Sequence, residues 1–205
     1  MARKTKQEAA ATRQQIIDAA RAVFAERGVS QTSLEQIAAE AGLTRGAIYW
    51  HFTNKTELFY ALRDQATLPL LDRIDATLSG REDIDPLTGI ELVLLEILRV
   101  VEEDEATRQT FDIMTLKCEY AGDFREVLAQ IMKPGNEFTR KLEESYREAK
   151  AAAILREGLK PSLLALDTYT FITGLLRLWF SDTEETGMRP HARALIRAHL
   201  ESRRK

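Results

Sequence analysis

The sequence predicts an all-α protein with a small N-terminal domain and a larger second domain. The 205 residues are 44% hydrophobic and 30% charged, with only ten Gly and five Pro, and β-branched runs are sparse. Apolar residues recur at three- and four-residue spacing in most segments, and these segments begin and end at typical helix-capping residues. We expect a three-helix helix-turn-helix domain over residues 1–55 and a larger helical domain over residues 56–205.

The first two helices are predicted from an apolar stripe and from end signals. Between Thr12 and Gly28 the apolar residues have the spacing of a helix with one buried face, and Gly28 has the usual position after a helix C-terminus. Ser33 and Gln36 form a capping box before a second short stripe, which Gly42 ends. Two short helices joined by a tight turn indicate helix-turn-helix.

The third helix, Arg45–Phe52, has few residues for a core of its own. Thr44 precedes it as a good N-cap, and a helical wheel brings Ile48 and Phe52 onto one side. Tyr49 and Trp50 have no evident place in a three-helix core, so we expect them to face a partner. The alternative is that they pack against a following helix. The small residues near the start of this helix favour close approach to a DNA groove.

The charge distribution is weakly informative. Residues 1–60 hold eight Lys or Arg and six Asp or Glu, so their net charge is +2. The remaining residues carry −5, which gives a net charge of −3 for the chain. A basic front on an acidic chain suits contact with a polyanion, but a chance fluctuation explains it equally well. Lys55 lies beside the first backbone N–H groups of the helix that begins at Asn54, where it is expected to contact phosphate.

Residues 13–20, 32–52, 54, 55 and 58 together resemble the N-terminal domain of the TetR family of bacterial transcriptional repressors, and most closely its AcrR-like branch. The resemblance implies two sets of DNA-binding residues. Contacts with operator bases or phosphates are implied for Arg45, Gly46, Tyr49, Trp50 and His51. Phosphate contacts or helix capping are implied for Thr32, Ser33, Thr44 and Lys55. The basic arm Arg3–Lys6 is expected either to enter the minor groove or to be a solvated tail.

Further helices are predicted in the second domain from the same signals. Their expected ranges are residues 54–79, 86–101 with Asp85 as N-cap, 106–119, 122–154 with an interruption at Pro134-Gly135, 163–180 with Ser162 as N-cap, and 190–202. The helix over residues 163–180 is apolar nearly all round and must be covered on every side. The resemblance implies that the last two helices pair with the same two helices of a second copy, so that a homodimer forms through a four-helix bundle.

A ligand cavity in the second domain is also implied by the resemblance. Thr170, Thr173 and Arg177 form a polar line on the most apolar helix. Either the line is structural, with threonine hydroxyls bonding back to the helix and Arg177 pairing with Asp112 or another acid, or it belongs to a cavity for a small hydrophobic or aromatic effector. The candidate lining residues are Phe111, Asp112, Thr115, Tyr169, Ile172, Thr173 and Arg177.

The resulting hypothesis is a dimeric repressor of a multidrug efflux operon, which binds a palindromic operator in double-stranded DNA and is released by its effector. The alternatives are a regulator of a metabolic operon, a helical cofactor-binding enzyme, and an interaction module whose helix-turn-helix no longer binds DNA. No cofactor or metal is expected, because the sequence lacks phosphate-loop and zinc-ligand patterns. One cysteine, Cys118, and the lack of about 18 uninterrupted apolar residues indicate a cytoplasmic protein without a membrane span.

Overall fold

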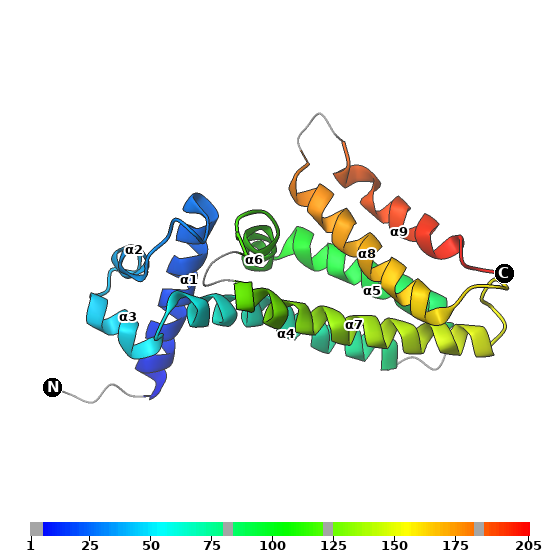
Figure 1. The fold of residues 1–205 in the computed structure, drawn as a ribbon, viewed down its shortest axis with the longest axis horizontal. Coiled ribbons are helices and arrows are strands. Elements are labelled where there is room, and N and C mark those ends of the chain that lie inside the picture. Colours follow the sequence, from blue (N-terminus) through cyan, green and yellow to red (C-terminus); the bar gives the residue numbers. More distant parts are fainter. Residues whose placement is uncertain (1–5, 80–83, 121–124, 183–186) are drawn as a thin grey trace. The chain divides into compact units, whose positions relative to one another are not determined.

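The computed structural model describes residues 6–79, 84–120, 125–182 and 187–205, and in these residues it contains helices and no strand (Figure 1). The all-α prediction is therefore confirmed. In chain order the helices are α1 (Lys6–Arg27), α2 (Leu34–Glu40), α3 (Arg45–His51), α4 (Lys55–Ser79), α5 (Pro86–Glu103), α6 (Glu105–Leu116), α7 (Arg125–Ala151), α8 (Pro161–Phe180), a 3-10 turn (Arg189–His191) and α9 (Ala192–Glu201). The arm at residues 3–5 lies outside the described residues.

Two compact units make up the chain. The first comprises residues 1–67 and 105–128, and the second comprises residues 68–104 and 129–205. Helix α6 thus belongs to the first unit by compactness, although it follows α5 of the second. Compact units and functional domains need not have the same limits, so a domain boundary after residue 55 remains a prediction.

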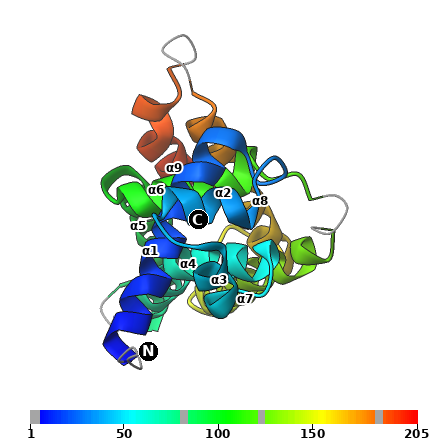
Figure 2. The same ribbon diagram turned by 90° about the vertical axis from the view of Figure 1, so that its left-hand side faces the viewer.

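The first unit is built on α1, which packs against α2 and α6, while α3 packs against α2 (Figure 2). Ile16, Ile17 and Phe24 are fully buried, and the ring of Phe24 meets that of Phe59 edge to face at 6.2 Å. Arg21 is buried too, and it donates hydrogen bonds to Thr110 of α6 at 3.3 Å and to Asp18 at 2.8 Å. This unit therefore holds the long helix α1 and the two short helices α2 and α3 on one continuous core.

The predicted capping of α2 is confirmed. Ser33 accepts a hydrogen bond from the backbone N–H of Gln36, and the Gln36 side chain accepts one from the backbone N–H of Ser33. At the other end Gly42 has a φ of +63°, a left-handed conformation that glycine adopts without strain. The turn between α2 and α3 is thus defined on both sides by local chemistry.

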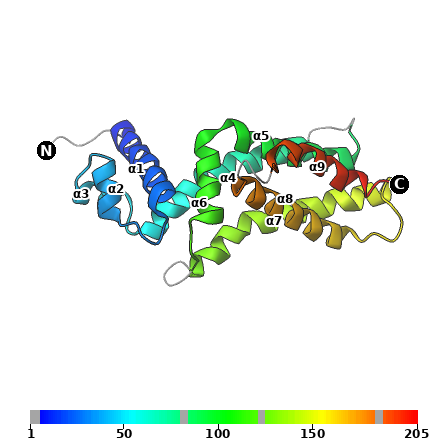
Figure 3. The same ribbon diagram turned by 90° about the horizontal axis from the view of Figure 1, so that it is seen from above.

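The second unit packs α5, α7, α8 and α9 along one another (Figure 3). As predicted, Asp85 caps α5 and Pro86 occupies its first position. The same carboxylate accepts a hydrogen bond from Arg204 near the chain's end, so the start of α5 is tied to the segment after α9. Arg193 of α9 also pairs with Glu102 of α5. These two contacts fix α9 against α5 at both ends.

Two predicted helix features are wrong. Helix α7 continues through Pro134, because one proline removes only one backbone hydrogen bond and the flanking turns remain paired. Helix α8 begins at Pro161 with Lys160 as N-cap, so Ser162 is already inside the helix. Proline suits the first helical position, where its missing N–H would have no helical partner.

Helix α8 is long and apolar enough to cross a membrane by length and composition alone, and the core helix of a folded protein passes the same test. Seven of its residues are buried among the helices of the second unit, including Thr168, Ile172 and Trp179. Its remaining face is exposed.

Candidate DNA interface and effector site

A few residues anchor helix α3 in the first unit, and most of its other side chains are exposed. Thr44 caps it by accepting a hydrogen bond from the backbone N–H of Ala47 at 3.2 Å, as predicted. Ile48 and Phe52 are buried and anchor one side of the helix in the first unit. A Cβ added to Gly46 would meet nothing within 4 Å, so the helix backbone is open there.

The opposite side of α3 carries the predicted base-contacting residues. The side chain of Arg45 is 73% exposed, and Trp50 is 71% and Tyr49 42% exposed. Trp50 meets the ring of His51 edge to face at 4.4 Å. Such exposure of large aromatic side chains beside an arginine is unusual for residues that only support a fold, and it suits stacking and hydrogen bonding to DNA.

Glu35 of α2 joins this surface and was not among the residues selected from the sequence. Its Oε1 accepts a hydrogen bond from the Tyr49 hydroxyl at 3.2 Å and lies 3.2 Å from Nε of Arg45. Its own backbone N–H, then the Tyr49 hydroxyl and the Arg45 charge, hold the pKa of this carboxyl below its ordinary value. It is therefore an anion at neutral pH, in the middle of a surface predicted to meet phosphates. No local spacing signals a contact between residues 14 positions apart.

Three of the predicted phosphate-contacting residues shape the turn before α2. Thr32 is buried and its hydroxyl donates to the carbonyl of Gly28 at 2.7 Å, while Ser33 takes part in the capping box. The Lys55 ammonium donates to the carbonyls of Val29 and Thr32, both at 2.7 Å. A capping or structural role is thus present for each of them. Their contacts with DNA remain predictions.

The candidate effector residues divide into two sets. Phe111, Asp112 and Thr115 lie on α6 in the first unit, where Asp112 pairs with Lys117 at 3.4 Å. The other four lie on α8 in the second unit, so their grouping with the α6 set remains a prediction.

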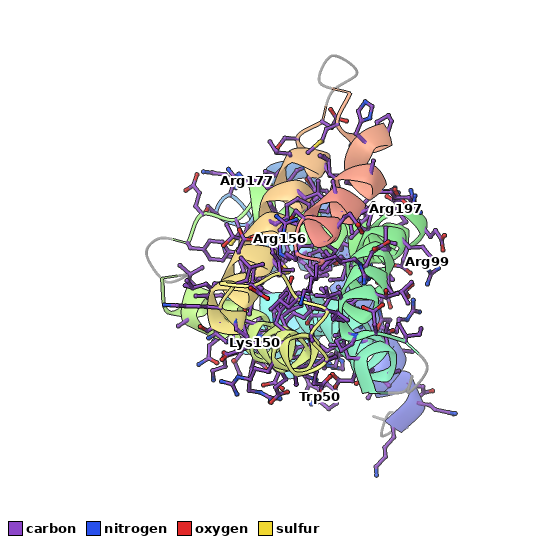
Figure 4. The ribbon with its side chains drawn as sticks, turned by 90° about the vertical axis from the view of Figure 1, so that its right-hand side faces the viewer. Trp50, Arg99, Lys150, Arg156, Arg177 and Arg197 are labelled. Atoms are coloured by element: carbon purple, nitrogen blue, oxygen red, sulfur yellow. The ribbon has the colours of Figure 1, made fainter. Side chains whose placement is uncertain are left out.

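The α8 candidates do not share one face. Ile172 is buried and Tyr169 half-buried, whereas Thr173 and Arg177 are exposed; Figure 4 labels Arg177 at the surface of this helix. The Thr173 hydroxyl donates to the carbonyl of Tyr169 at 2.8 Å, as the structural alternative for the polar line expects. Tyr169 and Ile172 are therefore the α8 residues best placed to line an internal cavity.

Cys118 is half-buried, and burial raises the pKa of its thiol to about 11. At neutral pH it is therefore a protonated thiol, whereas a reactive cysteine needs a lowered pKa. A structural role fits this residue better than a redox role.

A helix-turn-helix that presents exposed arginine and aromatic side chains, followed by a larger helical unit, defines a DNA-binding regulator. Comparison with known proteins agrees with this class. Residues 16–62 match the tetR family of bacterial regulatory proteins, and residues 85–203 match the C-terminal region of MAATS-type transcriptional repressors. The chain belongs to the TetR family of transcriptional regulators, as the resemblance predicted.

Its relatives include regulators linked to drug efflux. The regulator AcrR of Shigella flexneri is 32% identical over 201 residues, which are 98% of this chain and 93% of AcrR. NalD, a secondary repressor of the MexAB-OprM multidrug efflux pump in Pseudomonas aeruginosa, is 31% identical with a TM-score of 0.86, over 96% of this chain and 98% of NalD. SmeT, the efflux-pump repressor of Stenotrophomonas maltophilia, is 31% identical in its triclosan complex, with a TM-score of 0.83, over 95% of this chain and 92% of SmeT.

Proposed function

We propose that this protein is a ligand-responsive repressor of a multidrug efflux operon. It binds a palindromic operator as a homodimer in the cytoplasm, and a small hydrophobic or aromatic effector releases it. The observation that carries the proposal is the exposed arginine and aromatic side chains of α3, on a helix anchored by Ile48 and Phe52. The efflux repressors among its relatives support the biological role.

DNA recognition is assigned to the exposed side of α3. Arg45 has the donors for a guanine edge or a phosphate, and Tyr49 and Trp50 add apolar contact with bases or sugars. Gly46 allows the helix backbone to approach the groove closely, because it carries no side chain. A helix of this kind reads the major groove, and two copies read two half-sites.

Dimerisation is assigned to the exposed faces of α8 and α9. Leucines at positions 163, 166, 178 and 195 are exposed there, which is costly in a monomer. The α8 face is also arranged for pairing with itself in antiparallel orientation. Leu166 and Leu178 lie at equal distances in sequence from Ile172, and so do Asp167 and Arg177.

A two-fold axis beside the middle of α8 would bring each Asp167 near the partner's Arg177 and each Leu166 near the partner's Leu178. Arg203 of the same chain already binds Asp167, but the Asp167 side chain remains 60% exposed. This charge and apolar complementarity supports a second copy of the chain as the partner of α8.

The effector is assigned to the larger helical domain of residues 56–205, in which Tyr169 and Ile172 of α8 are candidate lining residues. Triclosan, the ligand in the SmeT complex, is small and aromatic, which supports an effector of this class. The mechanism requires that the effector bind more tightly to the conformation with the wrong spacing of recognition helices. The helix from Lys55 to Ser79 connects the two units and is the proposed carrier of the change.

The test is DNA binding with and without effector. Fluorescence anisotropy would measure affinity for the DNA upstream of this gene and of neighbouring efflux genes, and triclosan would serve as the first effector probe. We expect nanomolar, sequence-dependent binding by a dimer and release on addition of the probe or a related drug. Binding no tighter to this DNA than to a scrambled duplex would reject the repressor role, and release only by a metabolite would favour the metabolic alternative.

A further inference from the structure

We propose that Glu35 is a specificity-determining residue that positions Arg45 and Tyr49 for base recognition. The inference rests on the proposed DNA-binding function and extends it to a side chain outside the recognition helix. Glu35 is an acid on a surface that would meet a polyanion, and this location requires an explanation other than attraction to DNA.

The geometry is a closed set of three contacts. One carboxylate oxygen of Glu35 lies 3.2 Å from Arg45 Nε and accepts a hydrogen bond from the Tyr49 hydroxyl at 3.2 Å. The guanidinium carbon of Arg45 lies 5.4 Å from the centroid of the Tyr49 ring, within the range of a cation–π contact. Arg45 and Tyr49 are one helical turn apart, so a single anion on α2 restrains two neighbouring side chains of α3.

The backbone of Glu35 is fixed by the capped start of α2, and its side chain is less exposed, at 46%, than that of Arg45. Glu35 occupies the first turn of α2, between Ser33 and Gln36 of the capping box, where a negative charge is favoured by the helix dipole. Arg45, in contrast, is 73% exposed and has four rotatable side-chain bonds. A fixed carboxylate contacting Nε limits the orientations of the guanidinium plane, whose terminal NH2 groups contact a base edge or phosphate.

Fold stability is a weak reason for this arrangement. Ion pairs between exposed side chains contribute little to folding, so removal of Glu35 is expected to leave the unfolding temperature nearly unchanged. Ordering a long side chain before binding, however, lowers the entropy lost on binding, which changes affinity roughly two- to tenfold. This gain applies only where Arg45 meets its preferred base, whereas repulsion of phosphates by Glu35 acts on every sequence.

The experiment compares a specific and a non-specific duplex. Wild-type protein would select its preferred sequence from a random DNA pool, and anisotropy would then measure binding to the selected duplex and to a scrambled one. The variants are Glu35→Ala, Glu35→Gln, Arg45→Ala, and Glu35→Ala combined with Arg45→Ala. Glu40→Ala is the matched control, because Glu40 is also exposed on α2 and its replacement removes the same negative charge.

We expect Glu35→Ala to weaken binding to the selected duplex about three- to tenfold. Its affinity for the scrambled duplex should equal that of Glu40→Ala. Glu35→Gln keeps an oxygen acceptor for Tyr49 and Arg45, so it should recover part of the loss. The double variant should bind the selected duplex only slightly more weakly than Arg45→Ala, since Glu35 acts mainly through Arg45 and otherwise through Tyr49.

Three results would overturn the proposal. If Glu35→Ala and Glu40→Ala strengthen binding to both duplexes by the same factor, Glu35 only repels phosphate. If Glu35→Ala strengthens binding to the selected duplex more than Glu40→Ala does, the Glu35 carboxylate competes with DNA for Arg45. If wild-type protein selects no sequence at all, the repressor role fails first and the inference fails with it.

Discussion

Oγ1 of Thr168 on α8 lies 3.1 Å from Nε2 of His199 on α9, and it also lies 2.7 Å from the hydroxyl of Tyr146 on α7. Thr168 and Tyr146 are fully buried, so this chain of polar groups is enclosed by the second unit. The ring of Phe171 stacks on His199 with centroids 3.8 Å apart. One threonine thus fixes the register of three helices, two of which carry the proposed dimer surface.

Replacing Thr168 tests that role. Thr168→Val keeps the side-chain volume nearly constant but leaves the Tyr146 hydroxyl and the His199 nitrogen without this partner. We expect the free energy of unfolding to fall by about 1–3 kcal/mol, the usual cost of an unsatisfied buried polar group. Urea unfolding at fixed protein concentration measures it. Thr77→Val on α4, whose hydroxyl lies at the surface, is the control and should change stability by less than about 0.5 kcal/mol.

His199 predicts how stability depends on pH. Burial, and then the charge of Arg203, lower the pKa of His199 from 6.5 to about 4 in the folded protein. As the pH falls below 6.5 the unfolded chain takes up this proton first, so stability is complete above that pH and declines towards pH 4. Unfolding midpoints from pH 7.5 to 4.5 should decline less steeply in His199→Gln than in wild type. Identical slopes would mean that other groups cause the acid sensitivity.

Local chemistry made most of the fold predictable. Ser33, Thr44 and Asp85 cap the helices that their sequence context indicates, because each cap involves residues two or three positions apart. Pro134 misled the prediction, since its effect depends on whether the surrounding turns stay packed and not on proline alone.

For the candidate DNA interface, only the exposed residues of α3 itself were predictable from the sequence. The amphipathic pattern shows that Trp50 has no core position, and the structure leaves it exposed. The contacts of Glu35 with Tyr49 and of Lys55 with Val29 join residues 14 and 26 positions apart, and no periodicity encodes them. The exposed position of Thr173 was also missed, because a helix that is apolar on every side does not reveal which face is turned inward.

Arg45 and Lys55 should affect DNA binding differently. Arg45→Ala is expected to cost about 1–3 kcal/mol on the selected duplex alone, because it removes a contact with a base edge. Lys55→Ala should weaken binding to every sequence and reduce the slope of log affinity against log salt by about one, because it removes a phosphate contact. Anisotropy at several salt concentrations measures both effects.

The structure offers a second reason why Lys55→Ala could weaken DNA binding, and the same measurements can distinguish it from loss of a phosphate contact. Its ammonium group binds the carbonyls of Val29 and Thr32. A variant that loses thermal stability but keeps the wild-type salt slope would show that Lys55 only orders the turn before α2. Equal operator affinity of Arg45→Ala and wild type would remove base recognition by Arg45.

Gly135 and Tyr169 provide a test of packing next to the candidate effector site. A Cβ at Gly135 would lie 2.2 Å from the Tyr169 hydroxyl oxygen, so Gly135→Ala must displace this side chain. We expect a loss of about 1–3 kcal/mol in stability from overpacking. In a Tyr169→Ala background the clash is absent, and Gly135→Ala should stabilise the protein by up to about 1 kcal/mol through helix propensity. A double-mutant cycle in urea measures the difference, and additive effects would contradict the contact.

The proposed dimer surface predicts that a charge on α8 produces monomers. Leu178 is 57% exposed in the single chain, and in the proposed dimer it would be buried against the partner's Leu166. Leu178→Glu places an unpaired charge in that contact and should raise the dimer dissociation constant by at least tenfold. Leu68→Glu is the matched control, because Leu68 on α4 is 53% exposed and lies outside α8 and α9.

Sedimentation velocity over a range of concentrations would report the oligomeric state, and circular dichroism would show that each variant is folded. A palindromic operator requires two recognition helices, so the Leu178→Glu monomer should also lose affinity for the selected duplex while keeping its weak binding to scrambled DNA. A folded Leu178→Glu variant that remains dimeric would place the dimer contact elsewhere on the chain. Loss of the dimer in Leu68→Glu as well would show that charge alone, and not the α8 face, causes dissociation.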